Sequence, residues 1–385
     1  MVISRTPFRI SFFGGGTDYP AWYTQHGGSV LATTIDKYCY LTCRYLPPFF
    51  EHKSRIVYSK VEVLTSKRRI EHPAVRGTLE YLGITKGVEI HHDGDLPARA
   101  GLGSSSSFTV GLLHALYALK QVMPGKRRLA MEAIRIEQER LKEHVGSQDQ
   151  ISAAFGGLNR IDFDQEGAFR VHPLILPRTR LEELQRHLML FFTGLSRVAS
   201  DVAKDQIQAI PRRQAELKAM QEMVDRAVEL LIGQADLSDV GALLHEAWQL
   251  KRSLTHSIST SHIDGMYHAA CRAGASGGKL LGAGGGGFLL FMVKPERQRK
   301  VREALKQFLH VPFRFDTAGS QIIFYEPDTR YSQTQGAWRR GVSEGGDGHD
   351  AGASDIRPAV EATLPLEGED AEELSVSARS VALRR

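Results

Sequence analysis

The stretch Asp95–Ser107 reads DLPARAGLGSSSS and joins two segments of different character. Val88–His92 before it is a short apolar run of strand composition, and Ser104–Lys120 after it repeats apolar residues at helical spacing. The first N–H groups of a helix have no partner within the helix, and the helix dipole favours negative charge there. A glycine- and serine-rich turn that runs from a strand into a helix therefore predicts a phosphate-binding loop.

The composition of this loop supports the same interpretation. Its glycines let the backbone approach a ligand closely, and its serines offer hydroxyl groups to a phosphate or to magnesium. A flexible Gly/Ser linker is the alternative, but the strongly apolar helix that follows argues against it. The loop is not a Walker A motif, because no lysine follows the glycines. The candidate nucleotide contacts are Gly101, Leu102, Gly103, Ser104, Ser105 and Ser106.

A second glycine-rich segment, Pro7–Asp18, reads PFRISFFGGGTD. Its strand-like part ends in three glycines, and Thr17 and Asp18 follow. This order places Asp18 at a strand end, where its carboxylate could bind the hydroxyl groups of a polyol. Taken alone, the pattern is explained equally well if Asp18 caps the next helix.

The third glycine-rich segment, Gly282–Gly287, reads GAGGGG and matches the spacing GxGxxG. A dinucleotide-binding fingerprint must open a helix. Here the glycines lead into Phe288–Val293, which is strand-like, so the sequence does not predict a Rossmann site. It predicts a glycine-rich hairpin that packs against another phosphate loop.

Two acidic residues, Glu137 and Asp149, complete the candidate chemistry. Glu137 lies in a predicted helix, Arg128–His144, and in one straight helix the two carboxylates would lie about 18 Å apart. Gly146 offers a helix stop, and Ser147–Gln150 has the form of a capping box, so the chain can turn. Asp149 is then expected in the first turn of a new helix, facing the same cleft as Glu137. A simple dipole partner and an exposed helix carboxylate are the alternatives for the two residues.

Composition and length exclude several classes of protein. A chain of 385 residues is long enough for two domains, and 42% hydrophobic with 24% charged residues is ordinary for a soluble globular protein. The sequence has no apolar run of about 18 residues and no secretory signal, so no membrane association is expected. The three cysteines form no CxxC pair and fit a reducing cytoplasm, without a disulfide framework or a structural zinc site.

The formal charge of +5 is unevenly distributed along the chain. Residues 329–385 carry −3, which leaves +8 on the rest and favours anionic substrates such as ATP or a sugar phosphate. The basic residues are dispersed, so nucleic-acid binding is not expected. The segment 329–385 is rich in Gly, Ala, Asp and Glu with few aromatic residues, which predicts a disordered tail.

The three glycine-rich motifs, in this order, resemble those of the GHMP kinase superfamily, which includes galactokinase, homoserine kinase and mevalonate kinase. The resemblance covers about residues 1–328. It implies an α+β fold with an N-terminal lobe like ribosomal protein S5 domain 2 (1–185) and a ferredoxin-like C-terminal lobe (186–328). The mixture of strands, helices and hairpins agrees with α+β better than with a doubly wound parallel sheet.

Within the superfamily, the sequence is most similar to the D-glycero-D-manno-heptose 7-phosphate kinases. The similarity lies in Arg5–Arg9, Gly14–Asp18, Gln148–Gln150 with Ala153–Gly157, and Phe192–Arg197. It implies transfer of phosphate from ATP to O1 of the sugar, giving a 1,7-bisphosphate for nucleotide-activated heptose synthesis. A fucose- or galactose-type 1-kinase and a non-catalytic ligand-binding protein of the same fold are the alternatives. Galactokinases carry Glu-His where this chain has Gly15-Gly16, which disfavours galactose.

The resemblance also implies roles for individual residues. Asp149 matches the catalytic aspartate, and Arg9 matches an arginine that pairs with that aspartate and with the anomeric oxygen. Glu137 and Ser105 match the magnesium ligands, and the third motif adds Gly284 and Gly285 to the nucleotide site. The expected sugar contacts are Gly15, Gly16, Thr17 and Asp18, with Arg197 as a hypothetical partner of the sugar's phosphate. A solvated helix charge is the alternative for Arg197, and the sequence does not indicate an oligomeric state.

Overall fold

The computed structural model describes residues 1–47, 49–98, 100–195 and 199–327. A nine-stranded sheet contains the long antiparallel pair β1 and β2 and has the strand path β12-β1-β2-β5-β3-β4, with β6, β7 and β11 joined at its side. β3 and β5 pair in parallel, whereas the other strand pairs in the described residues are antiparallel. The strands of this sheet are β1 (Val2–Phe13), β2 (Gly28–Tyr45), β3 (Ser54–Val57), β4 (Val61–Leu64), β5 (Val88–Gly94), β6 (Leu158–Phe163), β7 (Phe169–Pro173), β11 (Phe315–Asp316) and β12 (Gln321–Tyr325).

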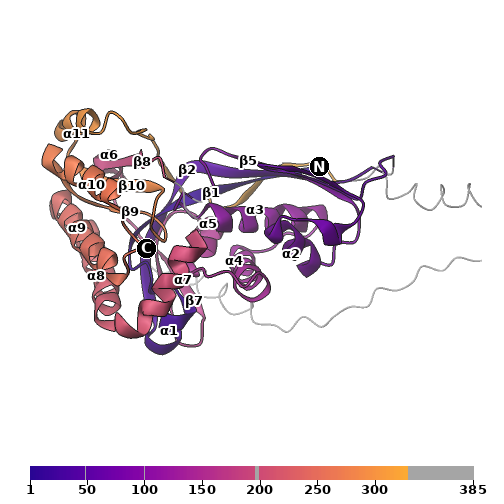
Figure 1. The fold of residues 1–385 in the computed structure, drawn as a ribbon, viewed down its shortest axis with the longest axis horizontal. Coiled ribbons are helices and arrows are strands. Elements are labelled where there is room, and N and C mark those ends of the chain that lie inside the picture. The colour runs from indigo at the N-terminus through magenta and orange to yellow at the C-terminus, as the bar shows by residue number, and fades with distance from the viewer. Residues whose placement is uncertain (48, 99, 196–198, 328–385) are drawn as a thin grey trace, which may run out of the picture. The chain divides into compact units, whose positions relative to one another are not determined.

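Helices gather on one face of this sheet, as Figure 1 shows for α2 to α5. α3 packs against β1 and β2 and buries apolar residues along its length, among them Phe108, Leu112 and Leu116. Because α3 follows the glycine loop directly, this packing fixes where the loop lies. The helices of this part are α1 (Pro20–His26), α2 (Pro73–Tyr81), α3 (Ser104–Leu119), α4 (Lys126–Arg135) and α5 (Gln148–Phe155).

Proline and a change of register shape β1 where the candidate site begins. Pro7 has no N–H group to donate to a neighbouring strand, and the pairing of β1 with β2 shifts between Pro7 and Phe8. Two residues later, the backbone N–H of Arg9 donates to the carbonyl of Leu102 at 3.0 Å. β1 is thereby tied to the phosphate loop by its own backbone.

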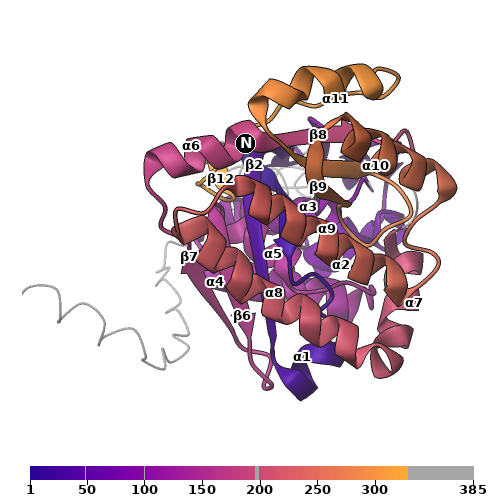
Figure 2. The same ribbon diagram turned by 90° about the vertical axis from the view of Figure 1, so that its left-hand side faces the viewer.

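A second, three-stranded antiparallel sheet has the order β8-β10-β9, and its central strand is buried at every position. α9 packs on β9, with α8 beside α9 in both views (Figures 1 and 2). Trp248, Tyr267 and Phe291 fill the core on this side. The elements are α6 (Arg178–His187), β8 (Leu188–Phe192), α7 (Ala199–Ala209), α8 (Gln214–Ile232), α9 (Leu237–Leu254), α10 (Ser261–Ala273), β9 (Ala275–Leu280), β10 (Phe288–Val293) and α11 (Gln298–Ala304).

The predicted α+β class is confirmed, but two local predictions are wrong. The helix expected over 128–144 ends as α4 at Arg135 and continues only as one π-helical turn, η2 (Ile136–Arg140). The capping box at Ser147–Gln150 does not form: Ser147 has φ −101° and ψ −6°, and its side chain does not cap α5 in the part of the chain described. A capping residue normally has extended backbone, which Ser147 lacks.

Candidate active site

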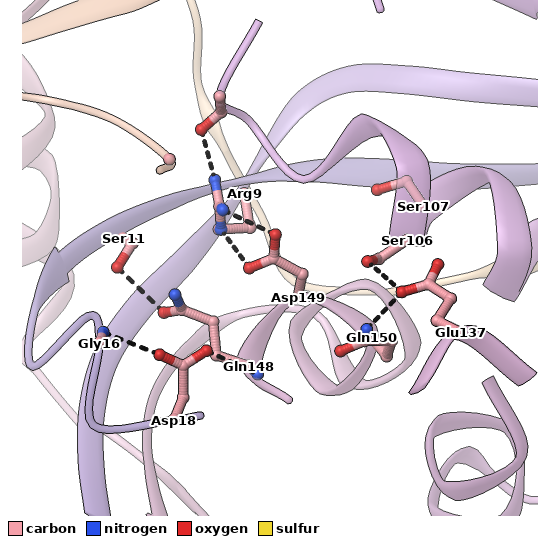
Figure 3. Close-up of polar contacts among 12 residues, drawn as sticks. Arg9, Ser11, Gly16, Asp18, Ser106, Ser107, Glu137, Gln148, Asp149 and Gln150 are labelled. Carbon is pink, nitrogen blue, oxygen red and sulfur yellow. Dashed lines mark hydrogen bonds and ion pairs between the residues drawn. The ribbon is translucent and has the colours of Figure 1, made fainter. Parts of the chain in front are cut away.

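The first turn of α5 places three consecutive side chains against three different partners (Figure 3). Successive side chains on a helix are rotated by about 100°, so neighbours in the sequence face different directions. Gln148 accepts a hydrogen bond from Ser11 Oγ at 2.9 Å, Asp149 pairs with Arg9, and Gln150 Nε2 donates to Glu137. The predicted place of Asp149 in the first turn of a new helix is confirmed.

Arg9 and Asp149 form a bidentate ion pair. Nε and Nη2 of Arg9 donate to the two carboxylate oxygens of Asp149 at 2.8 and 2.7 Å. Nη1 of Arg9 donates to the carbonyl of Gly101 at 2.7 Å. Arg9 is almost fully buried, whereas 23% of the Asp149 side chain is exposed. Charge-assisted bonds of this geometry fix orientation, so Asp149 is held beside the phosphate loop with its carboxylate still accessible.

The phosphate loop begins α3 directly beside this ion pair. Gly103 is the N-cap of α3 with φ +74°, a left-handed conformation that glycine adopts without strain. A Cβ atom on Gly103 would lie 3.2 Å from Asp149 Oδ2 and 3.2 Å from Arg9 Cγ. Within the described chain, no side chain caps this end of α3. The helix tip and the candidate catalytic aspartate therefore share one site, as the sequence predicted.

Glu137 lies on the other side of α5 and is completely buried. Its Oε2 accepts hydrogen bonds from Ser106 Oγ at 2.8 Å and from Gln150 Nε2. Its Oε1 is buried without a hydrogen-bond partner in the described part of the chain. Burial raises the pKa of Glu137 to about 7. A buried carboxylate with an unpaired oxygen is a site that a cation would satisfy.

The two neighbouring serines of the loop are placed differently, because Ser106 and not Ser105 donates to the Glu137 carboxylate in the described residues. Ser105 is exposed, and Ser106, one helical step further, is buried. The described residues contain no group of three or more His, Cys, Asp or Glu side chains placed to hold a metal. Magnesium commonly binds to one or two protein oxygens together with substrate phosphates and water. Glu137 and Ser106 fit such a site.

Asp18 is a further acidic residue of this region, and it is buried beside the start of α5. Its carboxylate accepts the backbone N–H of Gly16 at 2.9 Å and the backbone N–H of Gln148 at 3.3 Å. Its carbonyl accepts the N–H of Ser147 at 2.9 Å. Burial raises the pKa of Asp18, as does the nearby charge of Asp149, and the two backbone bonds oppose that rise.

These contacts exclude one of the two interpretations of Asp18, a cap on the next helix. Its side chain does not cap α1, whose N-cap is Tyr19, but it binds the start of α5 from a distant part of the chain. Gly146 is necessary there, because a Cβ atom on it would overlap the Asp18 carboxylate. Asp18 therefore belongs to the same site as Asp149.

Of the remaining residues predicted to contact the sugar, only some lie within the site. Gly15 and Gly16 lie near Ser11 and Asp18, within the site (Figure 3). The structure argues against Thr17 as a sugar contact. The residue is fully buried, and its hydroxyl donates to the carbonyls of Gly14 and Ser29 at 2.8 and 2.9 Å. It therefore supports the turn rather than a ligand. Arg197 lies outside the described residues.

The third glycine-rich segment interlocks with the phosphate loop, as predicted. A Cβ atom on Gly282 would overlap the Cα of Gly101, and one on Gly287 would overlap the carbonyl of Ala100. Gly284 and Gly285, the residues expected at the nucleotide, contact Ile258: Gly285 N–H donates to its carbonyl at 2.9 Å. The glycines that meet the loop are thus Gly282 and Gly287, at the two ends of the segment.

Two buried lysines near this junction were not anticipated from the sequence. Lys251 of α9 donates to the carbonyls of Leu280 and Gly282, and Lys279 donates to the carbonyl of Phe12 at 2.8 Å. Burial lowers the pKa of Lys251 to about 7 and lowers that of Lys279 well below its ordinary value. All three partners are backbone carbonyls, which leave no pattern in a sequence.

Comparison with known proteins adds independent observations. Residues 68–157 match the GHMP kinases N terminal domain, and residues 211–311 match the GHMP kinases C terminal domain. The chain is 27% identical over 321 residues to a D-glycero-alpha-D-manno-heptose 7-phosphate kinase of Campylobacter jejuni, covering 79% of this chain and 93% of that one. It is 25% identical over 329 residues to a bifunctional fucokinase/GDP-fucose pyrophosphorylase of Arabidopsis thaliana, covering 78% of this chain and 31% of that protein.

A solved structure shares the fold over nearly the whole described chain. The crystal structure of a D-glycero-D-manno-heptose 1-phosphate kinase from Bacteroides thetaiotaomicron superposes with a TM-score of 0.68 at 25% identity, covering 85% of this chain and 100% of that one. Among the described residues, no helix is both long enough and apolar enough to cross a membrane.

Proposed function

Because this chain carries both GHMP kinase domains and belongs to that family of kinases, we propose that it phosphorylates a sugar at the anomeric hydroxyl, O1, with ATP as donor. The proposed acceptor is D-glycero-D-manno-heptose 7-phosphate, and the product is the 1,7-bisphosphate. The observation that carries the proposal is the Arg9–Asp149 ion pair, which is anchored to the phosphate loop through the carbonyl of Gly101.

The reaction requires an acceptor oxygen, a proton acceptor and a site for the phosphates. O1 attacks the γ-phosphorus of ATP, the bond from that phosphorus to the β–γ bridging oxygen breaks, and ADP leaves with the electron pair. Asp149 takes the proton of O1–H on a carboxylate oxygen, and Arg9 keeps that carboxylate oriented. The backbone at the tip of α3 cradles the phosphates. Positioning and electrostatics supply most of the acceleration in phosphoryl transfer.

Magnesium is the metal that we propose for this site. Ser106 and Glu137 would hold it, since they present a hydroxyl oxygen and a carboxylate with one unpaired oxygen. When bound, the ion would neutralise charge on the β- and γ-phosphate oxygens. Gln150 donates to the same carboxylate oxygen as Ser106 and helps to fix the orientation of the carboxylate. This assignment replaces Ser105 by its neighbour.

The names of two relatives suggest two different acceptors. The Campylobacter relative is named for a heptose 7-phosphate, which has a free O1, whereas the Bacteroides protein is named for a heptose 1-phosphate, in which O1 is already esterified. We favour the first acceptor because the motifs Arg5–Arg9 and Gly14–Asp18 resemble those of the heptose 7-phosphate kinases, and the Campylobacter relative is similar over 93% of its own length. A fucose- or galactose-type 1-kinase is the second candidate, which the Arabidopsis relative favours.

The remaining parts of the proposal concern the sugar contacts, the lobe boundary and the location of the protein. Asp18, Gly15 and Gly16 are proposed to bind the sugar, and Arg197 is kept as a proposed partner of its phosphate. The lobe boundary at residue 185 stays a proposal, with the addition that β11 and β12 pair with strands of the first sheet. A cytoplasmic location likewise stays a prediction, and the predicted tail, 329–385, lies outside the described residues.

One assay tests the proposal directly. ADP release is measured with ATP and magnesium against heptose 7-phosphate, heptose 1-phosphate, free heptose, fucose and galactose, and phosphorus NMR locates the new ester. We expect the highest kcat/KM with heptose 7-phosphate and a new signal of a phosphate on the anomeric carbon. Turnover of heptose 1-phosphate alone would contradict the O1 assignment, and turnover of fucose or galactose alone would contradict the heptose assignment.

A further inference from the structure

Lys251 occupies an unusual position for a charged residue. It lies in the last turn of α9 with 7% of its surface exposed, and it donates to the carbonyls of Leu280, at 3.3 Å, and of Gly282. These carbonyls stand where β9 ends and the third glycine-rich segment begins. A cation in the interior is unfavourable unless it is paired, so an apolar side chain of similar length would be the more stable choice. Its charge therefore calls for an explanation beyond packing.

The segment that Lys251 holds is in direct backbone contact with the phosphate loop. Gly101 and Gly282 approach so closely that a Cβ atom on either would overlap the backbone of the other segment. On its far side, Gly101 gives its carbonyl to Arg9, and Arg9 holds Asp149. A continuous series of contacts thus runs from Lys251 through Gly282, Gly101 and Arg9 to Asp149. A shift of the glycine-rich segment would move the loop and the candidate base with it.

The charges around Lys251 belong to the same site. Arg9 and Lys279 are the cations that face it, and Asp18 and Asp149 are the carboxylates. Three cations stand against two carboxylates, which leaves a positive charge beneath the phosphate loop when all five groups are ionised. Such an excess is compensated when an anionic triphosphate arrives.

We propose that Lys251 is a positioning residue for the nucleotide: its ammonium group holds the third glycine-rich segment against the phosphate loop and keeps that loop in register with Asp149. The proposal rests on the ATP site described above, but not on the identity of the sugar. Burial is the largest cause that lowers the pKa of Lys251, the charge of Arg9 adds to it, and Asp18 and Asp149 oppose it, so that the pKa is about 7. The residue is thus partly neutral near pH 7, and a nearby anion would favour its ionised form.

The test compares Lys251→Met, Lys251→Arg and the control Lys294→Met. Lys294 is a surface residue that pairs with Asp236, away from the glycine-rich segments. The dissociation constant of ATP with magnesium is measured by calorimetry without sugar, so the result does not depend on the acceptor. We expect Lys251→Met to weaken ATP binding at least about 10-fold and Lys294→Met to change it less than about twofold. With the acceptor present, kcat should fall while the KM for the sugar changes little.

Two further measurements separate positioning from simple structural support. Between pH 6.5 and 8.5 the ATP affinity of the wild type should fall as Lys251 loses its proton, whereas that of Lys251→Arg should not show this fall, because arginine stays charged. Melting temperatures of all variants are measured alongside. Normal ATP binding by Lys251→Met, or equal weakening of ATP and sugar binding together with a lowered melting temperature, would overturn the proposal. If the wild type itself did not bind ATP, the failure would be that of the proposed function.

Discussion

Arg9 binds Asp149 with two of its nitrogens and the carbonyl of Gly101 with the third, so one side chain joins the candidate base to the phosphate loop. The consequence is that a rigid guanidinium group sets the distance between the Asp149 carboxylate and the carbonyl of Gly101. Lysine could supply the charge but not this fork of donors. The first two predictions concern this pair and the neighbouring metal site.

Asp149→Asn should lower kcat at least about 10²-fold, because the amide keeps the shape of the side chain but cannot take the proton of O1–H. The KM values should change far less, since neither ligand loses its main contacts. Steady-state kinetics with ATP and the sugar preferred in the substrate assay measures kcat and both KM values. Asp225→Asn is the matched control, because Asp225 is an exposed carboxylate that also pairs with an arginine, Arg160. Near-normal turnover of Asp149→Asn would refute its role as the base.

Ser106→Ala should raise the magnesium concentration needed for half-maximal rate, by about 10-fold or more, because it removes the hydroxyl that bonds to Glu137. Ser105→Ala is the matched control, since it makes the same chemical change one residue away at an exposed position. The measurement is a magnesium titration of the rate at saturating ATP. A larger effect of Ser105→Ala than of Ser106→Ala would restore the assignment that the sequence first suggested.

Gly146→Ala should weaken sugar binding more than ATP binding. A Cβ atom at residue 146 would overlap the carboxylate of Asp18, which must then leave the start of α5. We expect the KM for the sugar to rise about 10-fold or more. Gly265→Ala in α10 is the control, because nothing lies within 4 Å of its new methyl group and alanine favours a helix. It should melt at the same or a slightly higher temperature and keep full activity. Unchanged sugar kinetics in Gly146→Ala would argue against Asp18 as a sugar ligand.

Lys251→Met should be at least as stable as the wild type at pH 7, and this advantage should decline as the pH rises toward 10. The pKa of Lys251 is lowered from 10.5 to about 7 in the folded protein, so between these values the unfolded chain holds a proton that the folded chain releases. Stability then rises with pH through that window in the wild type, but this contribution is missing from the variant. Thermal melts at pH 7, 8, 9 and 10 measure the difference. A difference that stays constant over this range would mean that Lys251 does not titrate there.

Much of the site follows from the sequence because it depends on local backbone geometry. The strand–glycine–helix order around Gly101 predicted the phosphate loop, and the break near Gly146 predicted a new helix with Asp149 in its first turn. The preceding helical segment, however, already ends at Arg140. The strand character of Phe288–Val293 correctly separated the third glycine-rich segment from a dinucleotide fingerprint. In each case the neighbours in the sequence determine the conformation.

The failed capping box and the contacts that the sequence did not indicate depend on helix rotation and on distant partners. Which serine of the α3 tip faces Glu137 depends on the phase of the first helical turn, and the serine run offers the same side chain at four successive positions. The start of α5 is bound by Asp18, which lies 130 residues away from Gln148, rather than by the local capping box. Lys251 bonds to backbone carbonyls, and every residue has one. None of these contacts has a signature in residue type or spacing.

The pairing of β12 with β1 has a consequence for how the protein is made. Val2 is opposite Tyr325, so β1 is synthesised long before β12, the strand that covers this edge of it. Until then, β1 offers open N–H and C=O groups at which another chain could add. During synthesis the unpaired edge of β1 must be kept from pairing with other chains. Removal of residues 321–327 should therefore increase aggregation of the nascent protein.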